Sequence, residues 1–254
     1  PWRLVMAKRS KPHPDLFIEH ADVAAIPSKR IRWQSACRLI PSRYPPIDLF
    51  ERIAPASDWD ALIELEGMTN PRLREEAGAI SLVPVSRRVS GPGASIVMAP
   101  FTHASKERPT RFSDGSYGVY YAAQRFETSL REVAFHMGRF HAATRDKPLR
   151  CDYRGYQGKV ANTFSDLTSK SYPELLGPDI ATYGAAQRLA RMLRESNGNG
   201  IVYPSQRHEG GKCLAAFWPD VVAIPVQTRH VALRWDGEKM SDWFDYEENR
   251  WSAL

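Results

Sequence analysis

The sequence predicts an α+β fold, in which many short strands are mixed with a few helices instead of alternating with them regularly. Apolar residues from Phe126 to Met137 recur at helical spacing and define one face of a helix. A second helical stretch, 179–196, is followed by Asn-Gly-Asn-Gly at 197–200, which is typical of a helix C-terminus. Near the end of the chain, residues 230–246 are typical of a hairpin that turns at Asp236 and Gly237.

Length and composition describe an ordinary globular chain. Its 254 residues are 43% hydrophobic and 25% charged, which suits one large domain with or without an extension. No run approaches the roughly 18 apolar residues of a membrane helix, and residues 1–15 lack the apolar stretch of a signal peptide. The 3 cysteines show no disulfide or zinc spacing. We therefore expect a cytoplasmic protein with reduced thiols and no membrane contact.

The positive charge of the chain leaves three kinds of partner open. Lysine and arginine number 35 against 29 aspartate and glutamate, a formal net charge of +6. Nucleic acid, a phosphate-rich small ligand and an acidic protein would each suit this balance. Against nucleic acid, no run of lysine and arginine exceeds a few residues, and no known nucleic-acid-binding module is present.

The chain divides into two predicted regions. Residues 1–46 are rich in proline and carry a basic cluster at 29–32, so we interpret them as an N-terminal extension. Residues 47–254 form the predicted main domain. In the extension we expect a short helix at 21–25 and a helix or strand at 35–43. Further helices are expected from Ser57 to about residue 66 and near Pro71. Strands are expected at 47–54, 80–85, 95–99, 118–123, 149–153, 159–161, 201–205, 213–217 and 221–226.

Polar and aromatic residues concentrate in the stretch 111–136, RFSDGSYGVYYAAQRFETSLREVAFH. It places Arg111 before a turn, Tyr120 and Tyr121 on a strand, and Glu132 on the following helix. Arginine, a carboxylate and aromatic rings in one stretch are candidates for a binding or catalytic site.

A second such stretch, YPSQRHEGGK at 203–212, places Ser205 at the end of a strand before two glycines. Elsewhere the chain has no dinucleotide-binding glycine motif, P-loop, zinc-protease motif or serine-hydrolase motif. Its 7 histidines show no metal-ligand spacing. We therefore predict a site that contains no metal.

Together these stretches resemble the RES family, which is named for its arginine, glutamate and serine. The resemblance extends over about residues 47–235, and several motifs match in the family's order. The matching features are Arg52 in LFERIA, RFSDG at 111–115, GVYYAA at 118–123, Glu132, and YPSQRHEGG at 203–211.

The resemblance implies an ADP-ribosyltransferase-like fold, with a mixed β-sheet core and flanking helices, and an NAD⁺-binding catalytic domain over 47–254. Members of the family are toxins of bacterial toxin–antitoxin pairs, and the antitoxin is usually an Xre-type protein. Some members split NAD⁺ at the nicotinamide bond by hydrolysis or phosphorolysis, and at least one branch ADP-ribosylates a nucleotide-synthesis enzyme. We therefore expect an NAD⁺-consuming toxin, whose acceptor is water, phosphate or a target protein, and an antitoxin that covers its cleft.

The residue types fit the binding of NAD⁺. Arg52 and Arg111 can offer planar pairs of donors to the pyrophosphate. Tyr120 or Tyr121 can stack on the cationic nicotinamide ring. Because side chains alternate along a strand, only one of the two tyrosines can face the cleft.

The same residues fit the cleavage of a glycosidic bond. Glu132 can stabilise the positive charge that develops on the ribose when nicotinamide leaves, and it can hold the ribose hydroxyls. Ser205 can bond the nicotinamide amide or a ribose hydroxyl. The resemblance therefore assigns catalytic roles to Glu132, Arg111 and Ser205, and binding roles to Arg111, Ser205, Arg52 and the tyrosine pair.

Structural alternatives exist for the same residues. Glu132 lies about 145° from the centre of its helix's apolar stripe, so by itself it is typical of a solvated helix residue. A catalytic Glu132 requires that this face of the helix line a cleft. His136 lies one turn further on the same face and is more typical of a half-exposed structural histidine. Arg207 and Tyr183 are likewise more typical of scaffold residues.

Two other functions stay open as alternatives, a basic nucleic-acid-binding protein and an RNase-type toxin. The first is favoured by the isoelectric point of about 9.3. The second would require a pair of groups placed for general acid–base catalysis, and the sequence shows no histidine pair of that kind.

Overall fold

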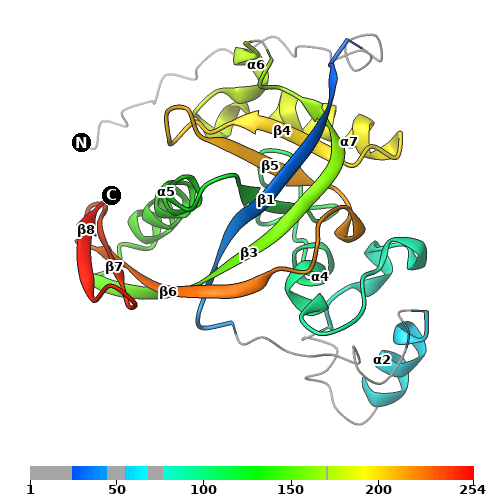
Figure 1. Ribbon diagram of the computed structural model, residues 1–254, viewed down its shortest axis with the longest axis horizontal. Helices are drawn as coiled ribbons and strands as arrows, with labels where there is room; N and C mark the ends of the chain where they lie inside the picture. The colour runs from blue at the N-terminus through cyan, green and yellow to red at the C-terminus, as the bar shows by residue number, and fades with distance from the viewer. Residues whose placement is uncertain (1–24, 45–54, 56, 68–76, 170) are drawn as a thin grey trace, which may run out of the picture.

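A mixed sheet surrounded by helices forms the described part of this computed structural model, which comprises residues 25–44, 55, 57–67, 77–169 and 171–254 (Figure 1). This architecture confirms the predicted α+β class. The strands are β1 (Ser28–Pro41), β2 (Tyr120–Ala123), β3 (Leu149–Asp166), β4 (Gly200–Pro204), β5 (Lys212–Ala216), β6 (Val226–Trp235), β7 (Met240–Asp245) and β8 (Arg250–Ala253). The helices are α2 (Trp59–Gly67), α4 (Ala94–Thr102), α5 (Phe126–Thr144), α6 (Pro173–Leu176) and α7 (Tyr183–Glu195), with short 3₁₀ helices η1 (Ile80–Leu82), η2 (Val85–Arg87), η3 (Ile180–Thr182) and η4 (Pro219–Val221).

Strand β3 connects two parts of the sheet. Along most of its length it pairs antiparallel with β1, and the two strands run side by side in Figure 1. Its last residues pair parallel with β4, and its first half pairs antiparallel with β6. Because β1 also pairs with β2, the order β1-β2-β5-β4-β3 closes back on β1, while β6, β7 and β8 extend the sheet beyond β3.

Strand β1 lies inside the predicted N-terminal extension. Ile31 and Trp33 are buried in the core, whereas Lys29, Arg30 and Arg32 are exposed, as expected for a basic cluster on a solvated face. The sheet therefore includes residues on both sides of the predicted boundary at 46 and 47, and we place Ser28–Pro41 with the main domain.

Several predicted elements have the expected positions. Helices α2, α5 and α7, strand β2 and the β6–β7 hairpin are confirmed, and Asn197 adopts a left-handed conformation just after α7. The strand predicted at 47–54, the helical piece at Pro71 and nearly all of the helix at 21–25 lie outside the described residues.

Other predicted strands are wrong. Residues 80–85 contain η1 and the start of η2, and residues 95–99 belong to α4. In the stretch 221–226, Val221 ends η4 and only Val226 belongs to a strand. Short apolar runs of this kind fit a strand or a buried helix equally well, and tertiary packing decides between them. The two strand pieces predicted at 149–153 and 159–161 are parts of the single strand β3, and β8 was not expected.

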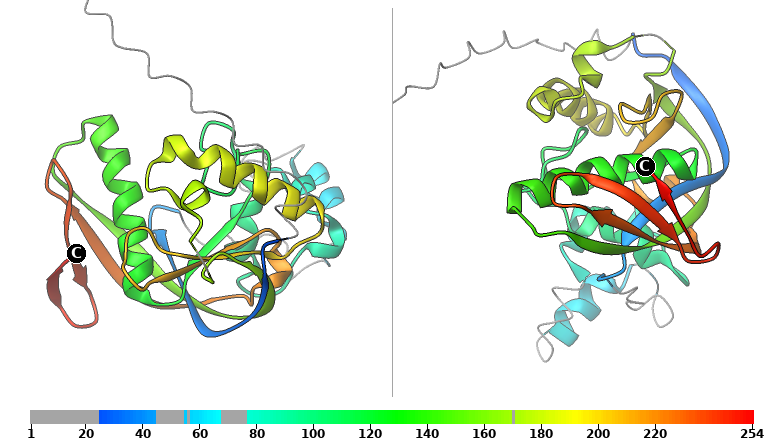
Figure 2. Two further views of the ribbon diagram at one scale, coloured as in Figure 1. Left: turned by 90° about the horizontal axis from the view of Figure 1, so that it is seen from above. Right: turned by 90° about the vertical axis from the view of Figure 1, so that its left-hand side faces the viewer.

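Helices α5 and α7 lie on the same side of the long strands β1, β3 and β6 (Figure 2). The apolar face of α5 packs with Tyr153, Leu233 and Trp235 in one hydrophobic cluster. The stripe of α7 that contains Leu189 packs into a second, larger cluster with β4 and β5.

Candidate functional site

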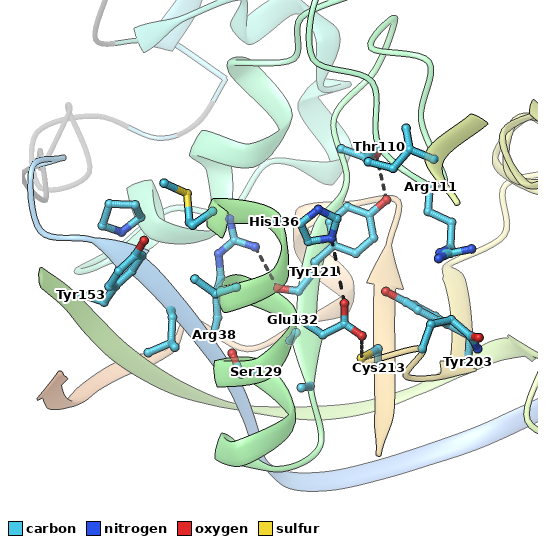
Figure 3. Close-up of a pocket in the computed structure, with 18 of the residues that line it drawn as sticks. Arg38, Thr110, Arg111, Tyr121, Ser129, Glu132, His136, Tyr153, Tyr203 and Cys213 are labelled. Carbon is cyan, nitrogen blue, oxygen red and sulfur yellow. Dashed lines mark hydrogen bonds and ion pairs between the residues drawn. The ribbon is translucent and has the colours of Figure 1, made fainter. Parts of the chain in front are cut away.

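A cavity of about 340 Å³ lies beside the polar face of α5, a volume within the usual range of small-molecule sites. Its wall combines residues from β1, β2, α5, β4 and β5, together with the segments before β2 and before α7 (Figure 3). The polar residues that line it include Arg38, Arg111, Tyr121, Glu132, His136, Tyr203 and Cys213.

Glu132 lines this cavity, so the face of α5 opposite its apolar stripe does border a cleft. One carboxylate oxygen, Oε1, accepts a hydrogen bond of 2.6 Å from Ser205 Oγ and a weaker one of 3.7 Å from Cys213 Sγ. The other, Oε2, lies 4.0 Å from His136 Nε2 (Figure 3). The carboxylate is therefore held in one orientation by groups from three elements.

Ser205 follows β4 and is itself held by the loop that leads to β5. Its Oγ accepts hydrogen bonds of 3.1 Å from the backbone N–H groups of Arg207 and His208. Its backbone N–H donates to the carbonyl of Gly211, which closes the loop. With its hydroxyl proton directed at Glu132, Ser205 orients the carboxylate, and it is buried behind Glu132 rather than lining the cavity wall.

The loop 205–211 is fastened to the start of α5. His208 Nδ1 and Thr128 Oγ1 are 2.9 Å apart. Gly211 lies so close to α5 that an added Cβ would come within 2.8 Å of the Thr128 side chain. Serine and glutamate, which are 73 residues apart in the chain, are thus brought together by the contact of this loop with α5.

The two tyrosines of β2 point in opposite directions, as strand alternation requires. Tyr121 lines the cavity, and burial raises its pKa to about 12. Its hydroxyl donates to Thr110 Oγ1 and accepts from the Phe112 backbone N–H, so the ring is fixed. Tyr120 is buried in the core and does not line this cavity.

Arg111 lines the cavity and also forms hydrogen bonds with neighbouring segments of the chain. Its guanidinium donates to the carbonyls of Leu175 and Gly177 and lies 4.4 Å from the centre of the Tyr183 ring. Within the described part of the chain it forms no ion pair with a carboxylate, so its charge is free to meet an anionic ligand. Arg52, the other predicted arginine, lies outside the described residues.

Sequence reasoning missed Arg38, which enters the cavity from β1. Its Nη1 donates to the Tyr121 carbonyl at 2.8 Å, and its guanidinium lies 4.8 Å from the centre of the Tyr120 ring. Burial lowers its pKa, and among the described residues no carboxylate pairs with it. No local motif marks this arginine, because its place depends on the pairing of β1 with β2 and β3.

His136 and Cys213 complete the surroundings of Glu132. Desolvation is the main cause that lowers the pKa of His136, against an opposing effect of Glu132, although 51% of the side chain is exposed. Burial and the nearby Glu132 raise the pKa of Cys213 well above its usual value, which keeps it a protonated thiol. Arg207, weighed as a possible ligand, packs on the Phe135 ring and bonds the Pro178 carbonyl.

No group of three or more metal-binding side chains occurs among the residues that the structure describes. The prediction of a metal-free site therefore stays a prediction. In the same described residues, no helix is long and apolar enough to cross a membrane.

Fold and site together define an α+β protein with a cavity in which arginines and one oriented carboxylate converge. Residues 85–236, more than half of the chain, match the RES domain, and the chain belongs to the RES family. It is 28% identical over 213 residues to the uncharacterized protein y4oC of Sinorhizobium fredii, across 83% of this chain and 87% of that protein. It also resembles, with a TM-score of 0.38 and 14% identity, a chain of the M. tuberculosis MbcT-MbcA toxin–antitoxin complex, over 87% of this chain and 91% of that one.

Proposed function

We propose that this protein is the toxin of a toxin–antitoxin pair and that it consumes NAD⁺ by breaking the bond between nicotinamide and ribose. Membership in the RES family supports the class of activity. The observation that carries the proposal is the Glu132 carboxylate, oriented by Ser205 inside a cavity that also contains two arginines with no carboxylate partner among the described residues.

The charges of the cavity suit NAD⁺. The pyrophosphate of this substrate is anionic, and its nicotinamide ring is cationic. Arg38 and Arg111 lack carboxylate partners in the described chain and would meet the pyrophosphate, because guanidinium groups bind phosphate oxygens in pairs. The fixed ring of Tyr121 would stack on the nicotinamide.

In the reaction, the C–N bond between ribose C1′ and the nicotinamide nitrogen breaks, and its electron pair stays on the nitrogen, so nicotinamide leaves neutral. The ribose is then oxocarbenium-like, and the Glu132 carboxylate stabilises its positive charge. An acceptor oxygen or side chain forms the new bond to C1′ and loses a proton. A fixed carboxylate in a partly dry cavity is more effective than a mobile one because it need not reorganise during the reaction.

Ser205 and His136 act around this carboxylate. Ser205 keeps Oε1 occupied, which leaves Oε2 as the oxygen that meets the ribose. His136, 4.0 Å from Oε2 and with a lowered pKa, is placed to accept a proton from an acceptor or a ribose hydroxyl.

The acceptor of ADP-ribose is water, phosphate or a side chain of a target protein. An enzyme that drains NAD⁺ harms its own cell unless it is blocked, so we propose a cognate antitoxin, of Xre type as the family resemblance implies, that covers the cavity. The net charge of +6 would suit an acidic antitoxin surface.

Product analysis tests the proposal. Purified protein is mixed with NAD⁺ labelled in the adenosine part, in buffer, with phosphate, or with a cell lysate, and nicotinamide and the labelled fragment are separated by chromatography. Free ADP-ribose, or ADP-ribose phosphate, together with nicotinamide, would identify an NAD⁺-degrading enzyme. Label on one lysate protein would identify a transferase.

Intact NAD⁺ in all three mixtures would contradict the proposal. A salt-titrated nucleic-acid-binding assay and an RNA-cleavage assay on the same preparation then address the two alternatives.

A further inference from the structure

A second cavity, of about 290 Å³, lies between η1, the turn before β2 and the C-terminal end of α7. It shares no lining residue with the cavity that contains Glu132. Its lining is rich in polar and charged groups and comprises Ser81, Leu82, Ser116, Tyr117, Arg191, Arg194 and Glu195.

Arg194 lines this cavity and packs against two aromatic rings. Its guanidinium lies 4.1 Å from the centre of the Trp218 ring and 4.8 Å from that of Tyr117, both of which are buried. Two aromatic rings therefore pack on the guanidinium and hold it in place, which favours the cation electrostatically. The rings cover the faces of the guanidinium. Its N–H donors lie at the edge, where they can bond acceptors.

Those acceptors are missing in the described part of the chain. The side chain of Arg194 forms no hydrogen bond or ion pair with any described residue, and its Nε is buried without a partner. Arg87 packs on the same Trp218 ring, at 5.2 Å, but donates to the Asp220 carboxylate and the Asn197 amide. Of two arginines on one tryptophan, one is thus supplied with acceptors and the other borders a cavity.

Neighbouring charges do not replace the missing acceptor. The Asp114 carboxylate pairs with Arg191, and the exposed Glu195 forms no ion pair with Arg194 in the described chain. Burial lowers the pKa of Arg194 against the opposing effects of Tyr117 and Glu195. A partly desolvated charge without a partner is unfavourable, and an anion from solution would relieve the cost.

We propose that the second cavity binds a phosphate group, with Arg194 as its main donor. Donors line the cavity from two walls, Arg194 and Arg191 from α7 and the Ser81 hydroxyl from η1. Donors that approach from different sides suit the tetrahedral oxygens of phosphate better than a flat carboxylate. Because Glu195 partly offsets the positive charge, a single phosphate group fits better than a polyphosphate.

Isothermal titration calorimetry of the full chain tests the site with two probes, inorganic phosphate and AMP. We expect wild-type protein to bind at least one probe, and Arg194→Gln to bind it at least tenfold more weakly. Arg87→Gln is the matched control, because it removes a guanidinium from the same Trp218 ring; its affinity should change less than threefold. Arg111→Gln, in the first cavity, should also leave this binding in place.

The two probes distinguish the source of the phosphate. Tight binding of inorganic phosphate identifies a free phosphate site, and preferential binding of AMP identifies a nucleotide site. Circular dichroism confirms that each variant is folded, and Arg194→Lys, which keeps the charge but loses the planar donors, should bind at least threefold more weakly.

Wild-type protein that binds neither probe at millimolar concentrations would overturn the proposal. So would equal affinity in Arg194→Gln, or a loss of affinity in Arg111→Gln alone. None of these results depends on whether the protein cleaves NAD⁺, so the two proposals fail separately.

Discussion

At the residue scale, the proposed function requires that one carboxylate oxygen be held in place. Ser205 supplies a short hydrogen bond to Glu132 Oε1, and Cys213 adds a longer one from a buried thiol. A thiol is a weak donor, so its share of the orientation is smaller than that of the hydroxyl. It nevertheless approaches from β5, a different element from the loop that carries Ser205.

We predict that Cys213→Ala lowers kcat for nicotinamide release about fivefold with little change in KM, because a net hydrogen bond of about 1 kcal/mol is lost. Cys213→Ser, which restores a donor, should recover most of the rate. Cys37→Ala is the control, since Cys37 is also buried but lies outside the cavity lining. Equal rates for Cys213→Ala and wild type would show that the thiol only fills space.

Sequence alone singled out Glu132 and Arg111, which line the cavity, and Ser205, which bonds Glu132, and for the tyrosine pair it predicted that only one faces the cleft. These residues lie in recognisable local stretches, and alternation along a strand is a local rule. Arg38 and Cys213 could not be found in this way. Their places in the cavity depend on pairings between strands that lie far apart in the sequence.

At the element scale, the two faces of α5 have different roles. One face packs on β3, β6 and β7, and the other carries Glu132 and His136 into the cavity. The helix is aligned with Ser205 by the loop 205–211, which contacts Thr128 through His208 and Gly211. The distance between Ser205 and Glu132 is therefore controlled by the fit of this loop to α5.

Replacing Gly211 tests that fit. A Cβ at this position would lie 2.8 Å from the Thr128 side chain and 2.9 Å from the His208 carbonyl, so the loop must shift. We expect Gly211→Ala to lower kcat more than tenfold, because small displacements of catalytic groups are costly. Gly184→Ala on α7, where a Cβ meets only the end of the Arg188 side chain, should leave the rate unchanged. Unchanged kcat in a folded Gly211→Ala would contradict the role of the loop.

Helical and hairpin elements with strong periodicity or turn signals could be predicted from the sequence, and α5, α7 and the β6–β7 hairpin are confirmed. The lengths of β1 and β3 could not be predicted from the sequence. Each is irregular, with a register shift between Trp33 and Ala36 in β1 and another at Gly155 in β3, and such shifts interrupt the alternation by which a strand is recognised.

At the scale of the whole molecule, β1 pairs with β3 over most of its length, and its first residues lie opposite the end of β3. Asp166, at that end, accepts hydrogen bonds from the Thr168 backbone N–H and hydroxyl and pairs with Lys29 of β1 at 3.5 Å. Although burial acts to raise the pKa of Asp166, the contacts with Thr168 and Lys29 outweigh it, and the pKa lies below the usual value.

The sign of the pH effect follows from that direction. A carboxyl whose pKa is lower in the folded state stabilises the protein above its unfolded pKa of about 3.9, and this contribution is lost as the pH falls through the lower folded value. We expect Asp166→Asn to lower the free energy of unfolding by about 1–2 kcal/mol at pH 7 and by less at pH 3. Urea unfolding at several pH values measures this, with the exposed Asp58→Asn as control. An effect of Asp166→Asn that does not depend on pH would contradict the account.

The role proposed for Glu132 in the cleavage of NAD⁺ is tested most directly by a comparison of two glutamates on one helix. Glu132 faces the cavity, whereas Glu127 of α5 is exposed outside it. Nicotinamide release is measured for wild type, Glu132→Gln and Glu127→Gln, after circular dichroism has shown that all three are folded. We predict that Glu132→Gln loses at least a hundredfold in kcat, as expected when a transition-state charge loses its stabilising group, while Glu127→Gln keeps the wild-type rate. A folded Glu132→Gln that releases nicotinamide as fast as wild type would contradict the assignment.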